Sequence, residues 1–352
     1  MGAELERRQE PRRPFRPWAL AFLVLLLLLG GGAFGAWEAF QARLSPVDAE
    51  SPSQVVVQIP EGASTQAIAQ LLYEKGIIRD PLAFRLYVRF KGEDGQLQAG
   101  WYGFSPSQDV ASIVAMLRRG EVLEFSFTVP EGKTVEEIRE ILLGLGFWSA
   151  DEVDRALRDT RWLEELPPPG VKEPLEGYLF PETYRFPYGT PVAEVVGKMV
   201  EETYRRFTPE RRERAKELGM SVHEVLTLAS IIEKEARFPE DQPKISAVFH
   251  NRLKLKMKLQ ADPTVAYALG KPGDQLTKRD LQAEVSYNTY VYEGLPPGPI
   301  ASPGEGAIEA ALHPAEVDYL YFVSAPDGTT YYARDYGTHL RNVQKVRQES
   351  RR

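Results

Sequence analysis

Two glutamates stand two positions apart in the stretch LASIIEKEARF, residues 228–238, with Lys234 between Glu233 and Glu235. The stretch begins as an apolar helix, and a charge cluster at a helix end is usually a solvated face. A carboxyl group held against apolar surface is different, because its ionised form is disfavoured and its pKa rises. Such a group can donate a proton near neutral pH. The direction of each side chain therefore decides what these residues do.

Helical geometry limits the directions of the two glutamate side chains but does not show which of them donates the proton. Ser221 and Glu224 form an S-x-x-E capping box, which predicts a helix over residues 222–236. At about 100° per residue the apolar side chains fill one broad arc, and Lys234 lies in the opposite, polar arc. The two glutamates fall at the two sides of the apolar arc. Either could be the proton donor, and either could instead pair with Arg237 or Lys244 or accept backbone N–H groups.

Three segments follow this helix and should surround it. Residues 244–253, KISAVFHNRL, have the apolar spacing of a second helix. Residues 254–260, KLKMKLQ, alternate Lys with Leu or Met, which predicts a strand with one basic face. In QADPTVAYALG, Asp262 can cap a short helix, Pro263 can be its first residue, and Gly270 can end it.

Aromatic and glycine-rich segments lie on both sides of these helices in the sequence. Residues 176–190, EGYLFPETYRFPYGT, are too irregular for a predicted strand, and Glu176 among their aromatics must be partnered or functional. Residues 286–304, SYNTYVYEGLPPGPIASPG, form a long Gly/Pro loop of the kind that binds ligands. Further on, YLYFV and TYYAR around Asp327-Gly328 predict a hairpin, followed by a short final helix.

The N-terminal region predicts a membrane anchor. Residues 18–37 contain no charged side chain and, as a helix, span about 30 Å, the thickness of one bilayer core. The preceding tail, residues 1–17, carries five arginines, and Trp18 and Trp37 stand where interfacial aromatics belong. This pattern predicts a cytoplasmic N-terminus and an exported C-terminal body. A cleavable signal peptide is the alternative, because AFG offers small residues for cleavage.

Charge and composition exclude several functions. The net charge is −7, and the tail holds five Arg against three Glu, so residues 38–352 carry −9, which argues against nucleic acid as a partner. The sequence has no cysteine, so disulfides, a thiol nucleophile and thiolate metal sites are excluded. Its four histidines show no metal-ligand spacing, so neither a metal nor a cofactor is expected. The length beyond the anchor predicts two or three domains.

A repeated unit follows the polar linker at residues 38–54. Residues 55–78 and 125–148 each contain a β-branched or aromatic run, a Pro-Glu-Gly turn, a Ser or Thr that can cap, and an amphipathic helix. Residues 102–122 echo the same pattern. Small exported βα modules of this kind resemble LysM-type domains, and that resemblance implies glycan binding.

The breaker LPPPG at residues 166–170 marks a domain boundary. We therefore expect an α+β protein with a single N-terminal transmembrane helix, a LysM-like βα repeat region and a C-terminal mixed α/β catalytic domain. The expected parts are a cytoplasmic tail (1–17), a transmembrane helix (18–37), a linker (38–54), the repeat region (55–148), a connector (149–175) and the catalytic domain (176–352).

Seven motifs together carry a family resemblance. EGYLFPETY, LASIIEKEA, VFHNRL, LQADPTVAY, SYNTY, GLPPGPIASPG and HPAEVDYLYFV occur in this order behind the anchor. With them the chain resembles the YceG-like endolytic murein transglycosylases, the MltG family, over nearly everything from residue 55 on. The resemblance implies internal cleavage of peptidoglycan glycan strands near the membrane, which leaves 1,6-anhydro-N-acetylmuramic ends. It also implies that the second glutamate of E-K-E, Glu235, is the catalytic acid and then the base.

The resemblance further implies roles for other residues and for partners. Glu233 and Glu176 would support the acid. The residues expected to bind sugar hydroxyls and acetamido groups are Tyr178, Asn251, Arg252, Gln260, Asp262, Thr264, Tyr287, Asn288 and Tyr290. The expected partners are peptidoglycan strands, the cytoplasmic (inner) membrane in which the chain is single-pass, and penicillin-binding peptidoglycan synthases.

Two other functions fit the same residues. A hydrolytic muramidase would use Glu235 as acid and Asp262 or Glu176 as its second carboxylate. A non-catalytic module would bind glycan through its βα repeats and recruit synthases. The products distinguish the three possibilities, because they would be anhydro ends, reducing ends or none.

Overall fold

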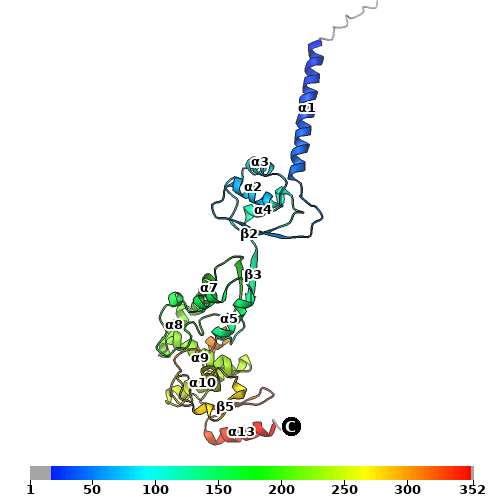
Figure 1. Cartoon of the computed structure of the whole chain (residues 1–352). Coiled ribbons are helices and arrows are strands. Elements are labelled where there is room, and N and C mark those ends of the chain that lie inside the picture. Colours follow the sequence, from blue (N-terminus) through cyan, green and yellow to red (C-terminus); the bar gives the residue numbers. More distant parts are fainter. Residues whose placement is uncertain (1–16, 350–352) are drawn as a thin grey trace, which may run out of the picture. The chain divides into compact units, whose positions relative to one another are not determined.

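The computed structural model describes residues 17–349. The chain divides into two compact units, Met1–Glu124 and Phe125–Arg352. Among the described residues the first unit has one short two-stranded sheet and the second has two, and each unit has helices and its own hydrophobic core (Figure 1). The predicted α+β class is therefore confirmed.

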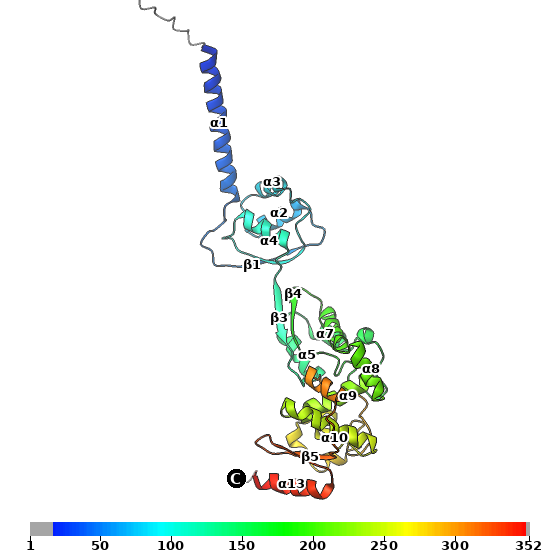
Figure 2. The ribbon, with the colours of Figure 1, turned by 180° about the vertical axis from the view of Figure 1, so that it is seen from behind.

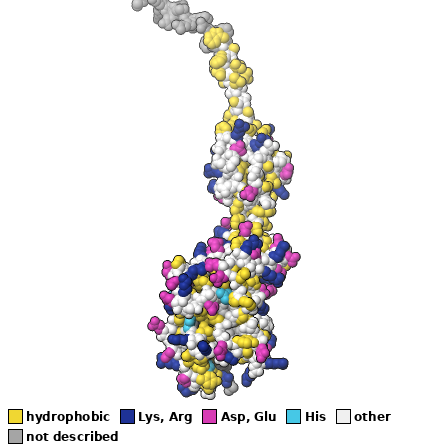
Figure 3. Space-filling model, turned by 90° about the vertical axis from the view of Figure 1, so that its left-hand side faces the viewer, with side chains coloured by type: hydrophobic (Ala, Val, Ile, Leu, Met, Phe, Trp, Pro, Cys, Tyr) yellow, Lys and Arg dark blue, Asp and Glu magenta, His cyan; other side chains and the backbone are white. Residues whose placement is uncertain are grey.

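The N-terminal helix α1, Pro17–Leu44, runs through its glycines without a break. Its segment Ala21–Leu44 is 24 residues long, is exposed over residues 21–39, and carries many hydrophobic side chains on its surface (Figure 3). Its length and apolar composition suit a bilayer-spanning helix, as predicted for residues 18–37. A signal sequence can have the same length and composition. The predicted tail lies outside the described residues except for Pro17.

The first unit is built on an antiparallel pair of strands. Val55 pairs with Phe104 at one end of the pair and Ile59 with Gly100 at the other. Three helices contribute buried side chains to the same core, and each begins at a side-chain cap. These elements are β1 (Val55–Ile59), α2 (Thr65–Glu74), α3 (Pro81–Lys91), β2 (Gly100–Phe104) and α4 (Val110–Arg119).

Both predicted strand-turn-helix copies form, but their strands have different partners. The second copy consists of β3, Glu124–Thr128, and α5, Val135–Gly144. Whereas β1 pairs with β2, β3 pairs with β4, Thr183–Pro187 (Figure 2). The region predicted as one repeat array, residues 55–148, is thus divided between the two units. The LysM-like resemblance remains a prediction.

Strand β4 corrects an expectation, because its segment looked too irregular to be a strand. The aromatic side chains of the two strands explain it. Phe127 stacks on Tyr184 and on Phe186, with ring centroids 5.6 and 6.4 Å apart. Alternate aromatics on paired strands stabilise each other across the sheet. The partner strand lies more than 50 residues earlier, so no local pattern could reveal it.

Helix α9, Val222–Glu235, is the central element of the second unit. It has eight consecutive buried residues, Val225 to Ile232, which means that it is covered all round. Its neighbours are α8 (Pro209–Glu217), α10 (Gln242–Lys254), α11 (Asp262–Leu269) and α12 (Glu305–Leu312). The other helical segments are α6 (Ala150–Leu157), η1 (Thr160–Trp162), α7 (Val192–Arg206), η2 (Pro239–Asp241), η3 (Gly273–Gln275) and η4 (Asp280–Gln282).

The predicted helices over 222–236 and 244–253 are confirmed, but the predicted strand at 254–260 is wrong. The segment after Lys254 is a turn and irregular chain. Lys256 and Gln260 have φ of 55° and 51°, in the left-handed region that a strand cannot contain. The alternation of Lys with Leu or Met therefore does not define one sheet face.

The C-terminal elements agree with the prediction. Strands β5, Tyr321–Ser324, and β6, Thr330–Ala333, pair antiparallel as a hairpin. Helix α13, Tyr336–Glu349, follows and packs on both strands.

Candidate active site

Glu235 is the last residue of α9, and local sequence explains its position. The predicted capping box is present, with Ser221 accepting from the Glu224 N–H and Glu224 accepting from the Ser221 N–H. At the other end Ala236 turns to an extended conformation, with φ −75° and ψ 123°, and the helix stops. A carboxylate at a helix C-terminus meets the negative end of the helix dipole. The ionised form of Glu235 is therefore disfavoured by its place in the helix alone.

Two cavities share Glu235 and Lys234 in their walls. The larger, of about 980 Å³, is bounded by the start of α5, by Lys172 to Glu176, and by α11 with the turn after it. The smaller, of about 490 Å³, is bounded by residues 324–326 of the hairpin and by α13. Glu235 thus has open space on two sides.

Burial and charge both act on the Glu235 carboxyl group. Burial raises its pKa to about 8, the Asp262 carboxylate adds to the rise, and the Arg252 guanidinium opposes it. Among the described residues no hydrogen bond contributes to this shift. The side chain as a whole is only half-buried, because it faces the cavities. The raised pKa favours the protonated form of Glu235 near neutral pH, and the partly exposed side chain is accessible from the cavities.

Asp262 lies beside Glu235 but does not cap its helix. The N-cap of α11 is Ala261, Asp262 is the first helical residue, and no side-chain cap is formed. The Asp262 carboxylate instead accepts a hydrogen bond of 2.5 Å from the Tyr290 hydroxyl. The predicted cap is wrong because this tertiary partner holds the side chain in the cavity wall. Asp262 and Tyr290, both expected near the substrate, are thus brought together next to Glu235.

Arg252 is buried, with 7% of its surface exposed, and it is committed to backbone carbonyls. Its Nε donates to Leu320 O at 2.7 Å, and its Nη1 donates to Leu259 O at 2.6 Å. It therefore joins α10 to β5 and to the segment that leads into α11. Its charge reaches Glu235, as the pKa of that carboxyl group shows.

Glu233 lines neither of these two cavities and instead holds the long loop. Its Oε2 accepts from the Gly304 N–H at 3.2 Å, and burial raises its pKa. Ser230 accepts from the Ile300 N–H at 3.0 Å, and His223 Nε2 bonds to Pro297 O at 2.8 Å. The loop predicted to bind ligands is thus fixed along α9 at three points. This arrangement favours Glu235 over Glu233 as the acid.

Glu176 is a second carboxyl group in the wall of the larger cavity, and only 1% of its surface is exposed. Both of its oxygens accept from the Val135 N–H at the start of α5, at 3.1 and 3.3 Å. Burial raises its pKa to about 8, and the nearby Tyr267 hydroxyl and the Val135 N–H act in the opposite direction. That hydroxyl is buried and makes no hydrogen bond of normal geometry.

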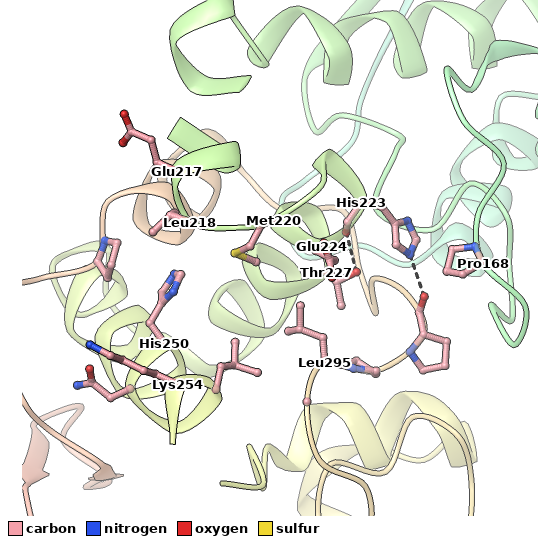
Figure 4. Close-up of a pocket in the computed structure, with 16 residues that line it drawn as sticks. Pro168, Glu217, Leu218, Met220, His223, Glu224, Thr227, His250, Lys254 and Leu295 are labelled. Carbon is pink, nitrogen blue, oxygen red and sulfur yellow. Dashed lines mark hydrogen bonds between the residues drawn. The ribbon is translucent and has the colours of Figure 1, made fainter. Parts of the chain in front are cut away.

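Two of the predicted substrate residues lie at other cavities. Asn251 donates to Val317 O at 2.9 Å and to Tyr319 O at 3.0 Å, and it borders a separate cavity of about 910 Å³. The Tyr178 hydroxyl bonds to His223 Nδ1 at 2.9 Å beside a cavity of about 600 Å³. Figure 4 shows the His223 ring turned toward the loop carbonyl. Neither residue borders the two cavities that share Glu235.

Four other predicted residues, one on α11 and three beside it, do not line the cavities of Glu235. The Thr264 hydroxyl lies 2.9 Å from that of Thr289, and Asn288 donates to Ala283 O at 2.7 Å. The Tyr287 hydroxyl accepts from the Lys172 N–H at 3.3 Å. These three side chains are buried, whereas Gln260 is exposed. The contacts of Thr264, Asn288 and Tyr287 hold the SYNTY segment in place against its neighbours.

Sequence reasoning missed several residues that border the cavities. Lys172 and Glu173 fall in the predicted connector, directly before the EGYLFPETY motif, and their nearness to it was the available signal. Tyr267 and Lys271 lie on and after α11. Arg237 borders the smaller cavity and donates to Pro326 O at 2.8 Å. Over residues 17–349, no three His, Asp or Glu side chains gather as a metal site would require.

The fold and the site define an α+β protein with a half-buried carboxyl group, that of Glu235, bordering two cavities. The chain matches the YceG-like family over residues 57–345 and belongs to that family. It is 37% identical over 332 residues to the endolytic murein transglycosylase of Bacillus subtilis (strain 168), covering 90% of this chain and 91% of that protein.

Two further comparisons agree with this membership. The endolytic murein transglycosylase of Streptococcus pneumoniae serotype 2 (strain D39) is 32% identical over 358 residues, covering 93% of this chain and 65% of that protein. The 2.6 Å crystal structure of a yceG-like protein from Listeria monocytogenes superposes with a TM-score of 0.57 at 35% identity. That superposition covers 83% of this chain and 99% of the other.

Proposed function

We propose that this protein is a membrane-anchored endolytic lytic transglycosylase of peptidoglycan, with Glu235 as its single acid and base. Family membership and the names of its relatives support the reaction. The observation that carries the choice of residue is the position of Glu235, which borders both cavities and has its pKa raised to about 8.

The reaction needs one proton carrier. Protonated Glu235 donates to the glycosidic oxygen between N-acetylmuramic acid and N-acetylglucosamine while the bond from the anomeric carbon to that oxygen breaks. The muramic C6 hydroxyl attacks the anomeric carbon, and the Glu235 carboxylate accepts its proton. The new ring is the 1,6-anhydro end, and Glu235 is again protonated. No water is consumed, so a second catalytic carboxylate is not required.

Neighbouring residues tune and hold the acid. Asp262 keeps the Glu235 proton in place by charge repulsion, while Arg252 limits this effect and fixes the surrounding backbone. Tyr290 orients Asp262, and the Asp262 carboxylate and the Tyr290 hydroxyl can contact sugar hydroxyls. Glu233 and Glu176 support the site at a distance, through the loop and through α5 respectively.

Cleavage inside a strand requires the glycan to continue past the acid in both directions. The larger and the smaller cavity, on either side of Glu235, are suited to hold sugars before and after the broken bond. Helix α1 would keep the enzyme in the cytoplasmic membrane, with residues 38–352 on the wall-facing side. Glycan binding by the LysM-like copies and association with peptidoglycan synthases belong to the same proposal.

A hydrolytic muramidase is the second candidate, and Asp262 is the observation that favours it. Its carboxylate is exposed in the larger cavity and interacts electrostatically with Glu235, so it could activate a water. In that case Glu235 would act only as acid.

Mass spectrometry of glycan strands tests these candidates. The purified full chain in detergent should convert uncrosslinked strands into fragments with 1,6-anhydro-N-acetylmuramic ends. Reducing N-acetylmuramic ends would establish the muramidase instead. Intact strands, with the protein folded and bound to them, would favour the non-catalytic recruiter.

A further inference from the structure

Helix α3 of the first unit leaves a row of large hydrophobic side chains uncovered. Leu82, Leu86 and Phe90 follow one another at four-residue steps, so they lie along one side of the helix. They are 56%, 48% and 87% exposed, although the opposite side of α3 is buried in the core. An apolar row of this size on a short helix indicates a binding surface.

Basic residues lie next to this row. Arg85 and Arg89 are exposed one helical row away from the leucines, and Lys91 ends the helix. The sequence of α3, PLAFRLYVRFK, contains no acidic residue. Exposed apolar and cationic side chains side by side are typical of a helix that lies in the interface of an anionic membrane.

Helix α3 is also attached directly to the end of α1. Arg43 of α1 forms an ion pair with Asp80, the N-cap of α3, at 3.0 Å. Arg79 donates to Pro46 O at 2.8 Å and to Val47 O at 2.9 Å, in the segment that leaves α1. Leu44 is buried in the core of the unit. The joint between the two helices is therefore packed and hydrogen-bonded.

This attachment puts α3 close to the bilayer if α1 spans it. Figures 1 and 2 both show α3 at the end of the unit from which α1 leaves. With Trp37 at the interface, α1 rises only about 10 Å further to Leu44. That distance is comparable to the headgroup layer of a bilayer.

We propose that α3 binds the surface of the bilayer that α1 crosses. Leu82, Leu86 and Phe90 insert at the level of the lipid headgroups, and Arg85 and Arg89 bind anionic phosphates. The proposal rests on the membrane anchor proposed above. It goes further, because it makes the first unit a docked domain with a fixed orientation instead of one that is only tethered.

Site-specific fluorescence can test this docking. The chain has no cysteine, so Leu86→Cys in the full-length protein takes a single environment-sensitive label. The matched control is Ser112→Cys, on the exposed side of α4 in the same unit. The proteins are reconstituted into vesicles of equal parts phosphatidylglycerol and phosphatidylcholine, with and without doxyl-labelled lipid that quenches nearby fluorophores.

We expect doxyl lipid to reduce the emission at position 86 by about half or more and to leave position 112 unchanged. Replacing Arg85 and Arg89 by Gln, or using phosphatidylcholine alone, should weaken the quenching. Equal emission with and without doxyl lipid at position 86 would overturn the proposal. So would shielding that depends on protein density and not on doxyl lipid, because a second copy would then cover α3.

Flotation separates this result from a failure of the anchor. Protein that floats with the vesicles but shows no quenching at position 86 contradicts only the docking of α3. Protein that does not float contradicts the membrane anchor itself, and the docking of α3 with it.

Discussion

Glu235 and Glu176 border the same cavity, and burial raises the pKa of each to about 8. Their surroundings differ in two respects. Glu176 is closed off from solvent and accepts hydrogen bonds from the Val135 N–H, whereas Glu235 is half-buried and its pKa is set without a hydrogen bond. One carboxyl group is thus part of the framework, and the other is available to a substrate.

The difference shows that a raised pKa does not by itself identify a catalytic acid. In both groups burial raises the pKa, because ionisation in a poorly solvated place is unfavourable. A general acid must also reach the atom that it protonates. Access therefore separates Glu235 from Glu176, and the following predictions test that separation.

The largest expected effect is on activity. Glu235→Gln keeps the shape of the side chain but removes the proton that is transferred, so cleavage should fall by about 10²-fold or more. Glu176→Gln should retain most of the activity, because we expect that buried group to support the site and not to transfer the proton. Rates of strand cleavage at equal protein concentration check both.

Glu233→Gln is the matched control, since it makes the same substitution two residues earlier on the same helix. It should reduce cleavage much less than Glu235→Gln, because Gln can still accept from the Gly304 N–H. Thermal melts must show that all variants are folded. A folded Glu233→Gln that is inactive beside an active Glu235→Gln would reverse the assignment.

For stability we expect the reverse of the order expected for activity, with Glu176 mattering more than Glu235. Glu176→Ala removes the acceptor of the buried Val135 N–H and leaves a void, so the free energy of unfolding should fall by about 2–4 kcal/mol. Glu176→Gln keeps an acceptor and should change it by less than about 1 kcal/mol. Urea denaturation below the unfolded pKa of 4.5, where the carboxyl group is protonated in both the folded and the unfolded state, measures both. A fully stable Glu176→Ala would mean that this carboxyl group is not part of the framework.

The two carboxyl groups should be alike in one property, the pH dependence of stability. Each has a folded pKa raised from 4.5 to about 8, so the folded state holds a proton that the unfolded state has lost in this range. The contribution of each carboxyl group to the free energy of unfolding is therefore full below its unfolded pKa. This contribution is lost as the pH rises through the folded pKa, by about 1.4 kcal/mol per pH unit.

Urea denaturation at several pH values between these limits checks this prediction. Replacing either Glu176 or Glu235 by Gln should flatten the slope by a similar amount, although only the second replacement abolishes cleavage. Unchanged slopes in both variants would show that neither group retains its proton in the folded protein.

The smallest expected effect is a shift in the pH profile of cleavage. Because the acid must be protonated, kcat/KM should fall as pH rises through about 8. Asp262→Asn removes the charge that helps to raise the pKa of Glu235, so this fall should begin at lower pH. If the wild-type profile is flat up to pH 9, the acid is not Glu235 with its raised pKa.

Local sequence patterns predicted most of the elements. The capping box before α9, the apolar spacing of α10 and the Asp-Gly turn between β5 and β6 act within a few residues, and all three were predicted correctly. The errors have a common cause. The strand at 254–260 does not form, β4 forms from a stretch expected to be irregular, and Asp262 is not a cap. In each case distant contacts decide the outcome.

The sequence alone determined that the chain carries an apolar N-terminal helix, two strand-turn-helix copies, and a helix that ends in Glu-Lys-Glu. These features follow from periodicity and capping, which depend on neighbours in the chain. Only the tertiary structure decided that the second copy pairs with β4, that Glu233 holds the loop, and that Glu235 lies between two cavities beside Asp262. The physical reason is that burial and electrostatic repulsion at Glu235 come from side chains that are far away in sequence and close only after folding.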